Sequence, residues 1–139
     1  MTTSSRTSHV DSLRSSVLIL EDDPLQALAL EDAVNRAGLK PLAASDCETA
    51  CRHVASCCLS AGILDIGLRH HLTSFSVAVE LDRVGVPFLF VSGYGADAIP
   101  ETLRSRPYMV KPWASDELIR ALRAMISAAR MEEACQKVG

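Results

Sequence analysis

The sequence lacks several features that would assign it to a special class of protein. None of its apolar stretches approaches the roughly 20 residues that a membrane-spanning helix needs. Residues 1–14 are rich in Ser and Thr and contain no apolar core of a secretory signal, so we expect a disordered tail there. The net charge of −3 gives no general attraction to nucleic acid. These absences favour a cytoplasmic protein that binds neither membrane nor nucleic acid.

The cysteines do not form a recognisable framework. There are five, an odd number, and no signal peptide accompanies them. Cys47 and Cys51 lie four positions apart near His53, but no second Cys or His pair completes a zinc site. We therefore expect reduced thiols. A length of 139 residues with 48% hydrophobic content predicts one globular domain over residues 15–130, with 131–139 as a helical extension or tail.

Short apolar runs alternate with helical segments, a pattern typical of a parallel sheet with helices on both faces. The strand expected at 40–44 contains Pro41 and is weakly apolar, so we place it at an edge of the sheet. Only a short fourth helix fits, at about 98–104. The strands are expected at residues 17–20, 40–44, 61–64, 86–91 and 108–110.

Capping signals and apolar spacing place the helices. Asp23 can cap a first helix that begins at Pro24 and ends at Gly38. Residues 45–48 fit a capping box for the second helix, and Gly85 ends the third. The side chains expected to face inward are, in chain order, Leu25, Leu28, Ala33, Ala37, Val77, Leu81, Val84, Leu118, Ile119, Leu122, Met125, Ile126 and Ala129.

Polar residues with reactive side chains follow four of the predicted strands directly. Because the carboxyl ends of parallel strands open on the same edge of a sheet, we expect these residues to share one pocket. They are Glu21 and Asp22 after the first strand, Asp65 after the third, Ser92 after the fourth and Lys111 after the fifth.

The charges of this pocket predict a divalent cation. Three carboxylates and one ammonium leave a negative balance, and oxygen ligands without Cys or His indicate Mg²⁺. Asp65 could then attack a phosphorus atom and form an acyl phosphate. Lys111 would offset charge on the phosphoryl oxygens, and the Ser92 hydroxyl would donate a hydrogen bond to them.

Four ordered segments resemble the receiver domains of two-component response regulators. They are VLILEDDP (17–24), ILDIGL (63–68), FLFVSGYG (88–95) and YMVKPW (108–113). The resemblance covers about residues 16–128. It implies an α/β flavodoxin-like fold, in which a doubly wound five-stranded parallel sheet in the order 2-1-3-4-5 is covered by five helices.

The resemblance also implies roles for the acidic residues. Asp65 is the phosphoacceptor, which receives its phosphoryl group from a sensor histidine kinase or a histidine phosphotransfer protein in the presence of Mg²⁺. Asp22 and Asp65 bind the metal directly together with the backbone carbonyl of Gly67, and Glu21 acts through a water. Such a domain phosphorylates and dephosphorylates itself and is not a turnover enzyme.

Signalling follows from the same resemblance. Ser92 and Lys111 contact the phosphoryl group. Ser92 is also the switch hydroxyl, and Tyr108 is the aromatic residue that turns inward with it. The face formed by the fourth helix, fifth strand and fifth helix then rearranges. No DNA-binding domain is expected to follow, so the output partner is another protein, and a homodimer is compatible with such domains.

Some positions depart from the receiver pattern. Gly67 replaces a residue that usually carries a side chain, and Trp113 stands where Phe is usual. The segment 92–111 is a few residues shorter than typical, which is similar to a subgroup of receivers found alone or attached to sensor kinases. His70 and His71 are expected to be exposed loop residues near the pocket.

Two other functions use the same residue types. A pseudo-receiver would bind a partner without phosphorylation, and the open position at Gly67 and the short fourth helix are compatible with it. A Mg²⁺-dependent aspartyl phosphatase of the haloacid-dehalogenase type needs a second Asp two residues after the nucleophile, where this chain has Gly67. A nucleotide-binding flavodoxin-like protein is disfavoured because no glycine-rich loop follows the first strand.

Overall fold

The computed structural model describes residues 16–67, 74–93 and 98–138. The expected N-terminal tail and the pair His70 and His71 lie outside these residues. The strands form one parallel sheet in the order β2-β1-β3-β4-β5, as predicted, with β2 at an edge. They are β1 (Ser16–Leu20), β2 (Lys40–Ala44), β3 (Leu59–Asp65), β4 (Phe88–Ser92) and β5 (Tyr108–Val110).

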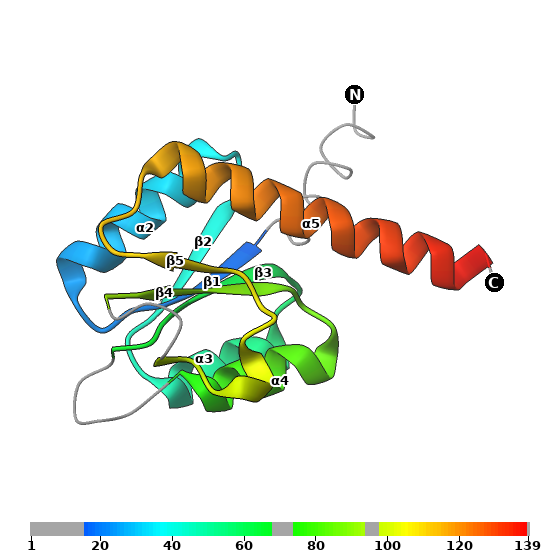
Figure 1. Cartoon of the computed structure of the whole chain (residues 1–139), viewed down its shortest axis with the longest axis horizontal. Helices are drawn as coiled ribbons and strands as arrows, with labels where there is room; N and C mark the ends of the chain where they lie inside the picture. The colour runs from blue at the N-terminus through cyan, green and yellow to red at the C-terminus, as the bar shows by residue number, and fades with distance from the viewer. Residues whose placement is uncertain (1–15, 68–73, 94–97, 139) are drawn as a thin grey trace.

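Helices cover both faces of this sheet (Figure 1). α2 and α5 lie on one face, and α3 and α4 lie on the other. α5 is one continuous helix that runs past the edge of the sheet toward the C-terminus. No helix in the described ranges has the length and apolar character to span a bilayer. The helices are α2 (Pro24–Arg36), α3 (Cys47–Ser56), α4 (Phe75–Val84) and α5 (Ser115–Val138).

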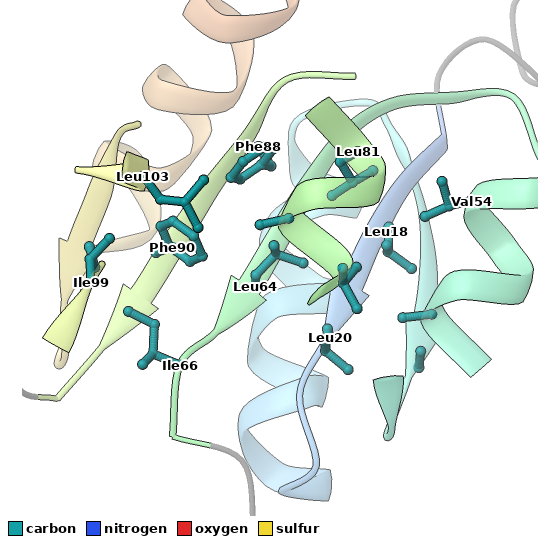
Figure 2. Packing of buried hydrophobic residues seen from close by; sticks show 14 residues of the cluster. Leu18, Leu20, Val54, Leu64, Ile66, Leu81, Phe88, Phe90, Ile99 and Leu103 are labelled. Carbon is teal, nitrogen blue, oxygen red and sulfur yellow. The ribbon is translucent and has the colours of Figure 1, made fainter. Parts of the chain in front are cut away.

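The central strands supply the core, which lies in two layers. All five residues of β1 are buried, and alternate side chains point to opposite faces, as the period of a strand requires. Leu18 and Leu20 therefore belong to the layer under α3 and α4, whereas Val17 and Ile19 pack under α2 and α5. Figure 2 shows the first layer, in which Leu81 of α4 lies over side chains of the sheet.

The predicted inner face of the first helix is partly wrong. Leu25 and Leu28 are 79% and 61% exposed, while Leu30, Ala33 and Val34 are buried. A helix turns through about 100° per residue, so positions 25 and 28 lie on the side opposite position 30. The sheet therefore selects the stripe through Leu30, and the first-turn leucines point to solvent.

Other boundaries differ by a few residues. The second helix is capped by Asp46, one position later than the predicted box, because its carboxylate accepts a hydrogen bond from Thr49 N at 2.7 Å. Val84 is 46% exposed and not inward-facing, since α4 ends there at Gly85 with φ +77°. β3 is longer than predicted at both ends, and β4 begins later because Pro87 precedes it.

The expected fourth helix is reduced to a single 3₁₀ turn, Glu101–Leu103. Pro100 precedes the turn and Pro107 follows it, and proline cannot donate the backbone hydrogen bond that a longer helix would need. Within the described ranges, four α-helices and this turn thus replace the five predicted helices. Ile99 and Leu103 still insert into the core beside Phe90 (Figure 2).

The two faces of α2 should differ sharply in their contribution to stability. We expect Leu30→Ala to lower the free energy of unfolding by about 2–5 kcal/mol, because it leaves a cavity in a site that is 2% exposed. Leu25→Ala, at a site that is 79% exposed, should change it by less than about 0.5 kcal/mol. Urea denaturation measures both. Equal effects would contradict the assignment of faces.

Candidate functional site

The register of the sheet brings the strand-end residues together. Leu20 pairs with Leu64, so the residues that follow them, Glu21 and Asp65, leave adjacent strands at the same level. Ser92 is the last residue of β4 and pairs with Val110 on β5. The pocket predicted from the strand ends therefore exists, and it forms at the carboxyl edge of β1, β3, β4 and β5.

Asp65 lies at the centre of this pocket. It is only 2% exposed. Its Oδ1 atom lies 3.2 Å from Nζ of Lys111 and accepts a hydrogen bond of 3.2 Å from the backbone N–H of Gly67. A carboxylate that is removed from water needs such partners, and an ammonium group is the strongest of them.

Glu21 is also buried, and it is poorly compensated. It is 3% exposed, and its Oε1 atom accepts a hydrogen bond of 3.2 Å from Asp23 N. Its Oε2 atom has no hydrogen-bond partner among the described residues, and Nζ of Lys111 is 3.9 Å away. Burial, followed by the nearby Asp65 carboxyl group, raises the pKa of Glu21 from its ordinary value of 4.5 to about 8, against the opposing effect of Lys111.

The three acidic residues fit a divalent cation. Glu21, Asp22 and Asp65 each offer a carboxylate oxygen, and these atoms lie within 4.8 Å of one another. The orphaned Oε2 atom of Glu21 and the excess of acid over base in the pocket are both relieved by a bound cation. Oxygen ligands alone suit Mg²⁺, which keeps part of its water shell.

Three consecutive acids thus have three environments. Glu21 is buried, Asp22 is intermediate in exposure, and Asp23 caps α2 as predicted. The Asp23 carboxylate accepts hydrogen bonds from Leu25 N at 2.9 Å and Gln26 N at 3.5 Å. Asp23 is therefore engaged by the helix and is absent from the acidic group.

The remaining predicted residues lie at the rim and floor of the pocket. Ser92 is fully buried, and its carbonyl oxygen accepts a hydrogen bond of 2.8 Å from Lys111 N. Gly67 is exposed and leaves the pocket mouth without a side chain. Tyr108 is 43% exposed on β5, three residues before Lys111. Six of the seven predicted residues end or follow a strand at this edge. Tyr108 is instead the first residue of β5 and pairs with Phe90, two residues before Ser92.

Sequence reasoning missed one contact of this pocket. Gln26, in the first turn of α2, accepts a hydrogen bond from Nζ of Lys111 through its Oε1 atom. Its Nε2 atom donates to Oδ2 of Asp23 at 3.2 Å. The available signal was its spacing of four residues from Leu30, which places Gln26 one turn before a buried residue on the same side of α2, although Gln26 itself is exposed.

The cysteines take no part in this site. None of the five is in a disulfide, and burial raises the pKa of Cys47 and of Cys51, which favours the protonated thiol. Within the described ranges, the one cluster suited to a metal is the acidic group. A cavity of about 560 Å³ lies at the opposite edge of the sheet, lined by Cys57, Val86 and Arg130 among others, far from these acids.

Comparison with known proteins relates this architecture to solved structures. No protein-family model matches the chain, and no curated protein does. SdrG from Sphingomonas melonis Fr1 is 33% identical over 83% of this chain and 98% of SdrG, with a TM-score of 0.72. SdrG in a BeF3-activated conformation, from Pseudomonas melonis Fr1, matches with the same identity and coverage and a TM-score of 0.69.

A more distant structure shares the fold. The receiver domain of the sensor histidine kinase PA1611 from Pseudomonas aeruginosa PAO1 is 22% identical over 81% of this chain and 98% of its own length. Its TM-score is 0.66, and that domain carries a magnesium ion coordinated in its active site cleft.

The protonation of Glu21 should appear in the stability of the metal-free protein. The pKa of Glu21 rises from 4.5 to about 8 on folding, so the folded state binds this proton more tightly than the unfolded state does. The stabilisation that this proton provides is fully present below pH 4.5 and is lost as the pH rises to about 8. We expect the free energy of unfolding to fall over this range relative to that of Glu21→Gln. Urea denaturation in a chelator measures both proteins. Parallel pH curves would contradict the assignment.

Proposed function

Since this chain belongs to the receiver-domain family of response regulators, we propose that it accepts a phosphoryl group on Asp65 and signals through the resulting change of shape. The donor is a histidine kinase or a histidine phosphotransfer protein. This makes the chain a phosphoacceptor signalling module and not a turnover enzyme.

One observation carries the proposal. Asp65 is 2% exposed at the end of β3, with the Lys111 ammonium at 3.2 Å and two further carboxylates in the same cluster. Its carboxylate has one ammonium partner, Lys111, but it shares the pocket with Glu21 and Asp22, so acidic groups outnumber basic groups there. That arrangement suits a group that binds a cation and then receives a phosphoryl group.

Mg²⁺ is the cation that the donor set fits. Asp22 and Asp65 would hold it through carboxylate oxygens, the Gly67 carbonyl would add a backbone ligand, and Glu21 would act through a water. When bound, Mg²⁺ supplies positive charge against the phosphoryl oxygens. The PA1611 receiver, which carries Mg²⁺ in its cleft, supports this reading.

The transfer step needs little from the protein beyond orientation and charge. A lone pair of an Asp65 carboxylate oxygen forms a bond to phosphorus, and the bond from phosphorus to the donor histidine breaks. The electron pair of that bond returns to the imidazole nitrogen. Lys111 neutralises charge that builds up on the phosphoryl oxygens, and the Ser92 hydroxyl donates a hydrogen bond to one of them.

Phosphorylation would reach the surface through β4 and β5. Ser92 is the switch hydroxyl of the proposal, and its backbone is bonded to that of Lys111. Tyr108, half-exposed on β5, turns inward when Ser92 moves toward the phosphoryl group. The surface that responds is formed by the 3₁₀ turn, β5 and α5, where a downstream protein or a second copy of the chain would bind. The expected setting is the cytoplasm.

Phosphorylation is tested by intact mass. We expect acetyl phosphate with Mg²⁺ to add one labile phosphoryl group, because Asp65 is the nucleophile held beside Lys111. Asp65→Asn should receive none, and neither should the wild type in a chelator. A beryllium fluoride analogue should bind under the same conditions. A chain that accepts neither acetyl phosphate nor beryllium fluoride would be a pseudo-receiver, and steady hydrolysis of assorted phosphate monoesters would indicate a phosphatase.

The metal ligands are tested by calorimetry. We expect Asp22→Asn to weaken Mg²⁺ binding at least about tenfold, because a direct anionic ligand is lost from the cluster. Asp46→Asn is the matched control, since Asp46, like Asp22, lies two residues after the end of a strand but is outside the acidic group. Equal loss of affinity in both variants would refute the proposed ligand set.

A further inference from the structure

We propose that Gln26 is a positioning residue for Lys111, holding its ammonium group over Asp65 for phosphoryl transfer. The proposal rests on the proposed function of Asp65 and adds to it a residue that contacts neither the acid cluster nor the phosphoryl group. Its basis is a run of contacts from the cap of α2 to the lysine: Asp23 to Gln26, Gln26 to Lys111, and Lys111 to Asp65.

The contacts fix which end of the Gln26 amide faces the lysine. Nε2 of Gln26 donates to Oδ2 of Asp23 at 3.2 Å, and a carboxylate can only accept. Oε1 of the same amide is then turned toward Nζ of Lys111, from which it accepts a hydrogen bond. Asp23 thus orients the amide, and the amide orients the ammonium.

The helix makes this orientation stable. The other carboxylate oxygen of Asp23 caps α2 by accepting from Leu25 N, so the residue that orients Gln26 is itself tied to the backbone. Gln26 lies four residues before Leu30, which is 2% exposed against the sheet. Packing of Leu30 therefore sets the rotation of the helix that brings Gln26 to the pocket.

Lys111 needs such a partner because its strand is short. β5 contains three residues, and Lys111 follows it directly. Of the two buried carboxylates, Asp65 is within hydrogen-bond distance of Nζ, while Glu21 is 3.9 Å away. Gln26 supplies a second acceptor, and the lysine chain then loses fewer conformations when the phosphoryl group arrives.

A neutral amide suits this position better than an acid. A carboxylate would pair with Lys111 and cancel the charge that the phosphoryl oxygens need. An amide oxygen directs the ammonium group and leaves its full charge available. This predicts that Gln26→Glu slows phosphorylation, although it retains a hydrogen-bond acceptor.

The rate of phosphorylation tests the proposal. With saturating Mg²⁺ and acetyl phosphate, we expect Gln26→Leu to slow labelling of Asp65 by about three- to tenfold, the loss that corresponds to the net contribution of one ordinary hydrogen bond. Asn35→Leu makes the same kind of change at an exposed site near the other end of α2 and should label at the wild-type rate. Gln26 is itself exposed, so its removal leaves the core intact.

A double-mutant cycle separates positioning from a merely structural effect. In a Lys111→Ala background the partner of Gln26 is gone, so Gln26→Leu should have no further effect on labelling. A structural defect would instead slow both backgrounds equally, and that result would overturn the proposal. Equal labelling of Gln26→Leu and the wild type would overturn it as well.

A metal-free measurement keeps this proposal distinct from the proposed function. The chain has three lysines, so acetylation of Lys111 by a small reagent can be followed by mass spectrometry with Lys40 as internal reference. Gln26→Leu should raise the ratio of Lys111 to Lys40 acetylation, because the amine leaves its acceptor. An unchanged ratio would overturn the inference even if the wild type is phosphorylated. A raised ratio in a chain that never labels would leave the contact standing and refute the receiver mechanism.

Discussion

The structure depends on the burial of like charges at one edge of a parallel sheet. Glu21 and Asp65 are 3% and 2% exposed, and one ammonium group, that of Lys111, approaches both. Burial is the main reason that the pKa of Glu21 rises to about 8, and the neighbouring Asp65 carboxyl group adds to it. The pocket therefore holds more acidic than basic groups, and a bound cation would balance them.

The rest of the fold holds this unfavourable arrangement in place. β1 is buried along its whole length, and its pairing with β3 aligns the two strand ends that carry the acids. The acids cannot move apart unless these strands separate. Separation would expose buried leucines, and the burial of each leucine side chain stabilises the fold by about 1.5–3 kcal/mol. Lys111 directly follows β5, the shortest strand, which has little packing of its own. The hydrogen bonds of Lys111 to Ser92 and Gln26 hold it in place instead.

The residues at the strand ends could be predicted from the sequence, because each apolar run is short and a polar residue follows it directly. Glu21, Asp65 and Lys111 were found that way. The inner face of α2 was predicted only in part. Ala33 is buried as predicted, but Leu25 and Leu28, which have the spacing of an apolar stripe, are exposed, and Leu30 and Val34 are buried instead. Gln26 was missed for another reason: it lies 85 positions from Lys111 in the chain, and its type alone carries no chemistry.

The shortened connection before β5 bears on how a signal would leave the pocket. Contacts hold both ends of β5. The backbone hydrogen bond from Lys111 to Ser92 lies after its last residue, and the side-chain contacts of Arg106 lie before its first. Nη2 of Arg106 donates to both carboxylate oxygens of Asp82 of α4, each at 2.7 Å. Tyr108 lies between these anchors and is 43% exposed, so its ring can change position without breaking either. Because one 3₁₀ turn stands in place of a full helix, the proposed signal would pass through β5 and α5, and a phosphoryl group bound by Lys111 would act on β5 directly.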